Sequence, residues 1–285
     1  MSKLEEVDQE KIPKQDRIEI LNEKLDAFYE VFRDKSVVIG YTGGLGSTVL
    51  MKLAQRVAKD LKCVFVETLY TSRNDKRAVE NYMQKDDLKE AGAITILVRP
   101  EINKDIMILN PEDRDFFCKK GISDALLDYC EKINFDFVAD GTYLELFDKL
   151  WGGKDRLGDK YVMIFGDFKL KYDDLKLIAE KNNINFSRPP EINMLSRFAY
   201  KIPITEALME SLKDAEDYIA EISGASVIRA RVLDPDHIVI ECKRSDLPKL
   251  LNEENREKIY VRLKAIGFKS IAIDLAGYRP HNMIR

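Results

Sequence analysis

The chain has 285 residues, a formal net charge of −4 and four widely spaced cysteines that form no C-x-x-C pair. This length suffices for one large domain or two modest ones with a proper core. Basic and acidic residues are interspersed, so the overall charge disfavours a nucleic-acid partner. No apolar run is long enough to span a membrane, and the N-terminus is charged. These two features predict a cytoplasmic protein with no membrane partner. The cysteine spacing and a total of two histidines disfavour zinc, disulfide and histidine-based chemistry.

The first two thirds of the chain alternate between strand and helix patterns. Residues 1–16 are charged and contain Pro13, which predicts a flexible N-terminus. Apolar runs predict strands at 37–41, 63–69, 94–98, 135–140 and 161–165. Helical spacing predicts helices at 17–33, 48–60, 76–91, 121–133 and 172–182. This alternation predicts an α/β fold, with a parallel sheet that carries helices on both faces.

The pattern changes after the segment Ser187-Arg188-Pro189-Pro190. A helix is predicted over 205–222, followed by strands at 227–233 and 238–242 around the turn Asp234-Pro235-Asp236. A helix over 246–266 and a strand over 268–275 complete the chain. We therefore predict an α/β domain over 17–190 and a small α+β domain over 200–285. The motifs described below assign nucleotide binding to the first domain, and substrate binding or oligomerisation to the second.

A glycine-rich turn joins the first predicted strand to the following helix. Glycines let the backbone approach a phosphate, and the free N–H groups of a helix N-terminus favour negative charge. Gly46 stands where a Walker loop has lysine, and the spacing does not match a dinucleotide fingerprint. An ordinary strand-to-helix turn explains this stretch equally well. If the loop binds a nucleotide, the candidate residues are Tyr41, Thr42, Gly43, Gly44, Gly46, Ser47 and Thr48.

Three further groups of residues could carry chemistry. Cys118 precedes Lys119 and Lys120, and neighbouring cations lower the pKa of a thiol. The segment Asp140-Gly141-Thr142 follows the fourth strand, at the sheet edge where α/β proteins bind ligands. Alternation places Arg229 and Arg231 on one face of a strand, where they could bind a phosphate or carboxylate. Each group also has a plain structural explanation: a solvated helix start, a β–α turn and exposed arginines.

In order and spacing, the motifs resemble those of LarE, a family of PP-loop sulfurtransferases that act on pyridinium-biscarboxylic acid mononucleotide. The segment 42–47 resembles the PP-loop S-G-G-x-D-S of N-type ATP pyrophosphatases, and 110–119 resembles N-P-x-x-R-C-x-x-C-K. Other matches are 140–143 to D-G-T-N, 156–158 to R-P-G, 188–200 to K-P-A…C-L-x-S-R-x-P-Y, 229–231 to R-V-R and 274–279 to D-L-x-G-Y-R. The resemblance runs from about residue 20 to the end of the chain.

The resemblance implies an adenine nucleotide alpha hydrolase-like fold, ATP and Mg²⁺ as cofactors, and a homo-oligomer. It implies that a substrate carboxylate is activated as an acyl-adenylate and then receives sulfur from a donor. Catalytic roles would fall to Cys118 and Lys119, and nucleotide contacts to Asp140, Gly141 and Thr142 besides the glycine-rich turn. An anionic small-molecule substrate would be bound by Arg114, Ser196, Arg197, Arg229, Arg231 and Glu241.

The chain departs from the family at several reacting positions. The PP-loop aspartate is Gly46, the asparagine of D-G-T-N is Tyr143, and two of three family cysteines are Asp115 and Asn193. One remaining cysteine disfavours an Fe–S cluster. The leading hypothesis is a divergent adenylating enzyme that transfers sulfur or nitrogen. One alternative is a non-catalytic relative that binds a nucleotide or substrate and assists cofactor assembly; activity restored by Gly46→Asp would argue for a decayed enzyme. Another is a tRNA-thiolating enzyme, which the acidic charge disfavours.

Overall fold

The computed structural model describes residues 14–84, 92, 94–97, 108–150, 157–186 and 193–279. Residues 1–13, Arg156 and the segment 188–190, which entered the sequence predictions, lie outside this part. The first elements are α1 (Lys14–Phe32), β1 (Ser36–Gly40), α2 (Leu45–Ala54), β2 (Asp60–Glu67), α3 (Arg73–Met83) and β3 (Ile94–Leu97). They are followed by α6 (Arg114–Lys132), β4 (Phe137–Asp140), α7 (Leu144–Leu150), β5 (Tyr161–Val162), α8 (Ile164–Asp167) and α9 (Tyr172–Lys181).

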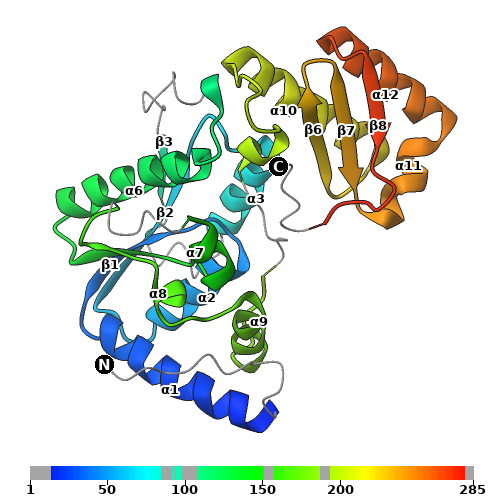
Figure 1. Ribbon diagram of the computed structural model, residues 1–285. Coiled ribbons are helices and arrows are strands. Elements are labelled where there is room, and N and C mark those ends of the chain that lie inside the picture. Colours follow the sequence, from blue (N-terminus) through cyan, green and yellow to red (C-terminus); the bar gives the residue numbers. More distant parts are fainter. Residues whose placement is uncertain are drawn as a thin grey trace.

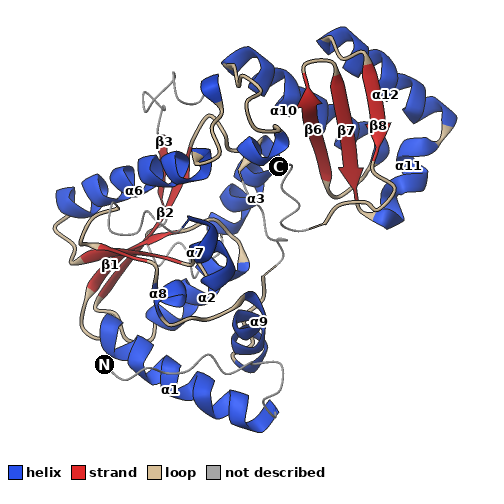
Figure 2. Ribbon diagram, in the orientation of Figure 1, coloured by secondary structure: helices blue, strands red, loops and turns tan. Residues whose placement is uncertain are grey.

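The larger lobe is built on a parallel sheet with the strand order β3-β2-β1-β4-β5 (Figures 1 and 2). The side chains of Val37 and Ile39 belong to an apolar core that also includes residues of α1, α2 and α9. The intervening Val38 belongs to a second core on the opposite face, together with Leu126 of α6. Strands buried on both faces explain the continuous apolar runs in the sequence, and the predicted α/β fold is confirmed.

Several element boundaries differ from the sequence predictions. Helix α2 begins at Leu45, three residues before the predicted start, so Gly46 and Ser47 lie in its first turn. Helix α6 begins at Arg114 and therefore carries Cys118. The predicted strand over 161–165 is two residues long and leads into α8. Apolar content alone does not distinguish a short buried strand from a buried helical turn, which explains this last difference.

The smaller lobe contains a three-stranded sheet in the order β6-β7-β8. Its elements are η3 (Met194–Arg197), α10 (Glu206–Ser223), β6 (Ile228–Asp234), β7 (His237–Cys242), η4 (Arg244–Asp246), α11 (Leu247–Leu251), α12 (Glu253–Ile266) and β8 (Ser270–Ile273). β6 and β7 form the predicted antiparallel hairpin, and β8 runs parallel to β7. The predicted helix over 246–266 is divided at Asn252, whose extended backbone ends α11 and whose side chain caps α12.

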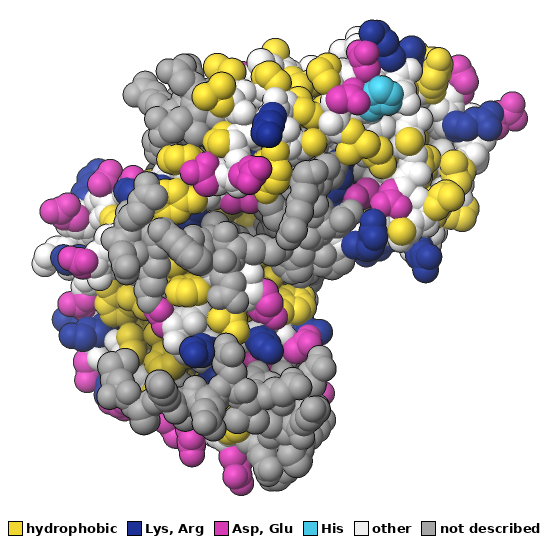
Figure 3. All heavy atoms as spheres, viewed as in Figure 1, with side chains coloured by type: hydrophobic (Ala, Val, Ile, Leu, Met, Phe, Trp, Pro, Cys, Tyr) yellow, Lys and Arg dark blue, Asp and Glu magenta, His cyan; other side chains and the backbone are white. Residues whose placement is uncertain are grey.

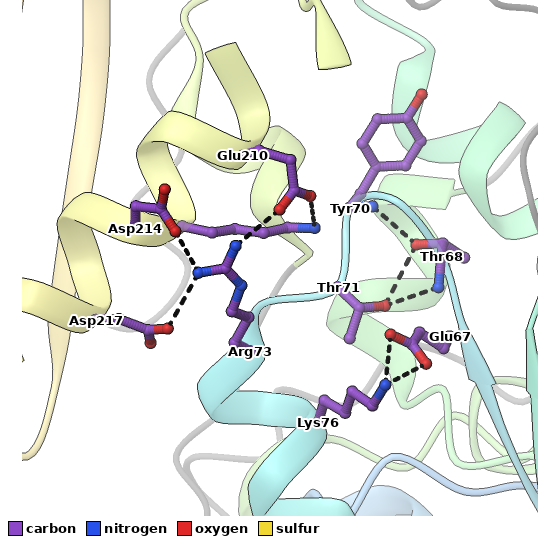
Figure 4. Close-up of polar contacts among 10 residues, drawn as sticks. Glu67, Thr68, Tyr70, Thr71, Arg73, Lys76, Glu210, Asp214 and Asp217 are labelled. Atoms are coloured by element: carbon purple, nitrogen blue, oxygen red, sulfur yellow. Dashed lines mark hydrogen bonds and ion pairs between the residues drawn. The ribbon is translucent and has the colours of Figure 1, made fainter. Parts of the chain in front are cut away.

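Arginines of α3 join the two lobes by ion pairs to α10. Arg73 lies 2.9 Å from Glu210, pairs also with Asp214, and lies 3.5 Å from Asp217 (Figure 4). Arg77 lies 3.0 Å from Asp217. An apolar cluster also crosses the junction, because it contains Tyr70 and Cys118 of the larger lobe together with residues of η3 and α10. Within the described part of the chain, no helix has both the length and the low charge needed to cross a membrane.

Candidate functional site

The glycine-rich turn lies at the carboxyl end of β1, the middle strand of the larger sheet. Gly43 has a φ of +72°, a conformation that glycine adopts without strain, and Gly44 is the N-cap of α2. Glycine has no side chain with which to cap the first N–H groups of the helix, and α2 has no acidic residue in its first turn. The N-terminus of α2 therefore keeps its capacity for an anion.

The Ser47 hydroxyl ties this turn together. It donates a hydrogen bond to the Gly44 carbonyl at 3.2 Å and accepts one from the Thr42 N–H at 3.2 Å. Its oxygen also lies 3.3 Å from the Thr42 hydroxyl, and the Tyr41 and Thr48 hydroxyls lie 3.4 Å apart below the turn. Thr42 is exposed, whereas Ser47 and Thr48 are buried. The turn therefore has a defined shape, with its exposed side toward Thr42.

Gly46 in the first turn of α2 and Gly141 in the loop that follows β4 bring these two segments together. A Cβ on Gly46 would lie 2.1 Å from the Gly141 carbonyl oxygen, and a Cβ on Gly141 would lie 2.4 Å from the Ser47 nitrogen. Such distances are far inside van der Waals contact, so the two backbones touch and neither position has room for a side chain. The predicted nucleotide segments 41–48 and 140–142 are thus in direct backbone contact. The same contact leaves no space for the aspartate that PP-loops carry at position 46.

Asp140 ends β4 and is held by three neighbours. Lys119 of α6 forms an ion pair with its Oδ2, to which Tyr161 also donates a hydrogen bond at 2.5 Å, and the Thr142 N–H donates to its Oδ1 at 2.8 Å. Burial by itself would raise the pKa of Asp140, but the Lys119 charge and these hydrogen bonds hold the pKa below its usual value. The Lys119 ammonium also lies 3.3 Å from the Thr142 hydroxyl. Asp140 is therefore a buried carboxylate that stays ionised.

Cys118 does not have the activated thiol that the sequence predicted. Its side chain is buried, and burial together with the charge of Asp115 raises the pKa of Cys118 to about 12. The neighbouring Lys119 and a hydrogen bond from Asn193 Nδ2 at 3.2 Å oppose this shift but do not outweigh it. The expectation of a lowered pKa for the Cys118 thiol is wrong for two reasons. The Lys119 ammonium forms its ion pair with Asp140, and the desolvation of the buried thiol is the larger effect on its pKa.

Cys118 lies close to two side chains that entered the sequence comparison. It contacts the Asn193 side chain, and it is close enough to Asp115 for that carboxylate to affect its pKa. Asp115 lies one helical turn before Cys118 on α6, whereas Asn193 precedes η3 and lies 75 residues from Cys118 in sequence. The contact between Cys118 and Asn193 is therefore the one that the tertiary structure adds.

The predicted substrate arginines of the smaller lobe form a buried cluster. Arg229 and Arg231 lie on the same face of β6, and Arg231 Nε is 2.7 Å from Glu241 of β7. Arg197 of η3 lies 2.9 Å from Glu216 of α10. All five side chains are at most 5% exposed. Removing charges from water is costly unless each is paired, so the burial of these arginines depends on their carboxylate partners.

Ser196 connects the arginines. Its carbonyl oxygen accepts a hydrogen bond from Arg231 Nη1 at 2.8 Å, and its hydroxyl accepts one from Arg197 Nη1 at 3.1 Å. Burial lowers the pKa of Arg231, with further contributions from Arg197 and Arg229, while Glu241 opposes the shift. The arginines are therefore close enough to repel one another, and an added anion would relieve this repulsion.

Arg114 lies apart from that cluster. It is fully buried, forms a hydrogen bond with the Asn110 side chain, and stacks over the Tyr200 ring at 4.4 Å. Asn110 in turn donates to the carbonyl oxygens of Ala199 at 2.7 Å and Ile202 at 2.9 Å. Arg114 therefore links the segment around residue 200 to α6, while its buried Nε and Nη2 atoms have no hydrogen-bond partner among the described residues. Its predicted role in substrate binding stays a prediction.

Some residues of the site were not identified from sequence. Tyr161 reaches Asp140, and Glu216 accepts hydrogen bonds from Arg197 and from the Ala230 N–H at 2.8 Å. Glu216 could have been found, because it falls on the apolar face of its helix with Leu212 and Ile219, where an acidic residue implies a buried partner. Tyr161 gives no such signal, since aromatic residues are common in strands.

The described residues around the glycine-rich turn do not fit a magnesium ion held by the protein. Mg²⁺ is usually bound by one or two carboxylates together with phosphates and water. Position 46 holds no carboxylate, and both oxygens of Asp140 already have partners. Among the described residues, no three His, Cys, Asp or Glu side chains are grouped as metal ligands.

The fold and the site define an α/β protein with a glycine-rich turn at the carboxyl edge of a parallel sheet. No protein-family model matches the chain. The uncharacterized protein MJ0830 of Methanocaldococcus jannaschii is 30% identical over 254 residues, which cover 88% of this chain and 94% of that protein. The uncharacterized protein slr1717 of Synechocystis sp. is 22% identical over 277 residues, 93% of this chain and 98% of that protein. The chain belongs to the same family as MJ0830.

Proposed function

We propose that this protein is a LarE-like, ATP-dependent enzyme that activates a substrate carboxylate as an acyl-adenylate for transfer of sulfur or nitrogen. The observation that carries the proposal is the contact between the turn at 41–48 and the loop at 140–142. It joins two segments of the motif series at the sheet edge where α/β proteins bind nucleotides. The contact between Cys118 and Asn193, which belong to two further motifs of the series, supports the same resemblance.

In the proposed reaction, the nucleotide and the substrate are bound by different parts of the protein. The N-terminus of α2 binds ATP phosphates, and Arg197, Arg229 and Arg231 bind an anionic group of the substrate. A substrate carboxylate oxygen attacks the α-phosphorus, the bond to the β-phosphate oxygen breaks, and pyrophosphate leaves. A sulfur or nitrogen nucleophile then attacks the acyl carbon, and AMP leaves with the bonding electrons. The buried, protonated Cys118 favours sulfide or ammonia from solution as this nucleophile over the thiol itself.

A continuous series of contacts connects the two binding regions. Lys119 contacts Asp140 beside the nucleotide turn, and the adjacent Cys118 contacts Asn193. Asn193 caps η3, which carries Arg197. On the other side, the Arg229 guanidinium lies 5.5 Å from the Tyr278 ring. After β8 the chain runs back from the small sheet toward the larger lobe (Figure 1).

Release of pyrophosphate tests the proposal. The protein is incubated with ATP and a panel of pyridinium and tetrapyrrole carboxylates, with and without sulfide, and pyrophosphate and AMP are quantified. We expect substrate-dependent formation of both products in equal amounts. Loss of this activity in Arg231→Met, with ATP affinity unchanged, would assign the arginine cluster to the substrate. No pyrophosphate with any compound would count against the proposal.

A non-catalytic nucleotide-binding protein is the second candidate. Its support is the closed space at Gly46, because the family uses a carboxylate there. Tight ATP binding without turnover would favour it. A tRNA-thiolating enzyme receives less support, since on the face shown in Figure 3 the Lys and Arg side chains are interspersed with Asp and Glu.

A further inference from the structure

We propose that Lys119 serves as the built-in cation of the nucleotide site, so that ATP binding requires the Lys119 ammonium and does not require a divalent metal ion. This inference rests on the proposed function. It assigns Lys119 to the phosphates of the nucleotide, rather than to the activation of Cys118.

The position of Lys119 supports this role. Its ammonium bonds Asp140 Oδ2 and the Thr142 hydroxyl, the two side chains that flank Gly141. Gly141 is the residue whose backbone touches Gly46 and Ser47 at the start of α2. The ammonium is thus held beside the backbone N–H groups that would bind phosphate. A cation and a helix N-terminus on one side of a loop favour the same anion.

The Lys119 ammonium has one more N–H donor than it has hydrogen-bond acceptors among the described residues. It carries three N–H bonds, and the described residues account for two acceptors, Asp140 and Thr142. The Lys119 side chain is 17% exposed, whereas that of Asp140 is 7% exposed. The carboxylate is therefore more fully enclosed than the lysine side chain, whose ammonium also lies 5.5 Å from the Tyr161 ring. In this proposal the third N–H donates to a phosphate oxygen.

The same arrangement offers a metal ion few carboxylate ligands among the described residues. The PP-loop aspartate is absent, and a carboxylate at position 46 would collide with the Gly141 carbonyl. The nearby carboxylate of Asp140 is occupied by Lys119, Tyr161 and the Thr142 N–H. A monovalent ammonium fixed in place would thus replace a divalent ion held by carboxylates.

The test measures binding of ATP and of α,β-methylene-ATP to the full chain by calorimetry, in MgCl₂ and in EDTA. For the unaltered protein we expect affinities in the two buffers that agree within about threefold. Lys119→Met should weaken binding in EDTA by about 10- to 100-fold, the usual worth of a hydrogen bond to a charged group. The control is Lys120→Met, because Lys120 pairs with Asp124 on the outside of the same helix, and its affinity should not change.

Lys119→Met leaves the buried Asp140 without its counter-charge, and the single variant could fail to fold for that reason. A second variant keeps the test usable in that case. The double variant Lys119→Met/Asp140→Asn removes both charges of the pair, which proteins tolerate better than removal of one. It should fold and bind ATP as weakly as the single variant. Binding that occurs only with Mg²⁺, and equally well in both Lys119 variants, would overturn the inference and leave the proposed function standing. Absence of nucleotide binding under every condition would overturn both.

Discussion

The contact between Gly46 and Gly141 makes a sharp prediction for the variant Gly46→Ala. Alanine is a better helix former than glycine, so in the first turn of α2 the substitution would by itself stabilise the fold by up to about 1 kcal/mol. The new Cβ, however, would lie 2.1 Å from the Gly141 carbonyl oxygen. Carbon atoms pack at about 3.5 Å or more, so the loop after β4 would have to retreat by more than about 1 Å.

The collision should outweigh the helix propensity. The atom in the way is backbone, which cannot rotate aside as a flexible side chain would, and overpacking costs about 1–3 kcal/mol. We expect a net loss of about 1–2 kcal/mol in the free energy of unfolding, measured by urea denaturation. Nucleotide affinity should fall as well, because the displaced segment carries Asp140 and Thr142.

The matched control is Gly44→Ser in the same turn. A Cβ on Gly44 would lie 3.6 Å from the nearest atom, the Thr42 hydroxyl, and serine is a favoured N-cap residue. Its stability should therefore stay within about 0.5 kcal/mol of the unaltered protein. We also expect that Gly46→Asp will not raise the rate of ATP cleavage above that of the unaltered protein, because the new side chain has no space beside Gly141. A Gly46→Ala protein as stable as the parent, or a Gly46→Asp protein that cleaves ATP faster than the parent, would refute the close packing of these two loops.

Three further predictions concern other parts of the molecule. Glu216→Gln leaves Arg197 buried without its counter-charge, so the free energy of unfolding should fall by about 3–5 kcal/mol. Chemical denaturation measures this change, and a loss below about 1 kcal/mol would show that the ion pair is dispensable. Cys118 should react with iodoacetamide at pH 8 on the order of 100-fold more slowly in the native protein than in urea, because its pKa is raised to about 12. Mass spectrometry measures the extent of labelling, and rapid labelling of the native protein would contradict the burial of the thiol. The neutral Cys118 thiol also contributes stability below about pH 9 that is lost as the pH rises toward about 12, since the unfolded chain releases this proton first. Arg73→Ala should cost less than about 1 kcal/mol, and less still in 1 M NaCl, because its ion pairs are partly exposed; a loss that does not respond to salt would point to packing.

Much of the candidate site was visible in the sequence because it depends on local patterns. The glycines at 43 and 44 indicate a strand-to-helix turn, and alternation on β6 correctly placed Arg229 and Arg231 on one face. The sequence missed Glu216 as their neighbour because contacts between a helix and a strand edge depend on how the two pack. It misjudged Cys118 because a row of charges in sequence does not reveal which charges turn away from the thiol.

By itself, the sequence determined the parallel α/β core, the mixed C-terminal unit and the position of the glycine-rich turn. These features follow from the periodicity of apolar residues and from the conformational freedom of glycine, which act over a few residues at a time. Only the tertiary structure decided that Gly46 rests on Gly141, that Lys119 pairs with Asp140, and that Cys118 meets Asn193. These contacts join segments that are distant in the chain, and their energies depend on distance and burial, which the order of residues does not specify.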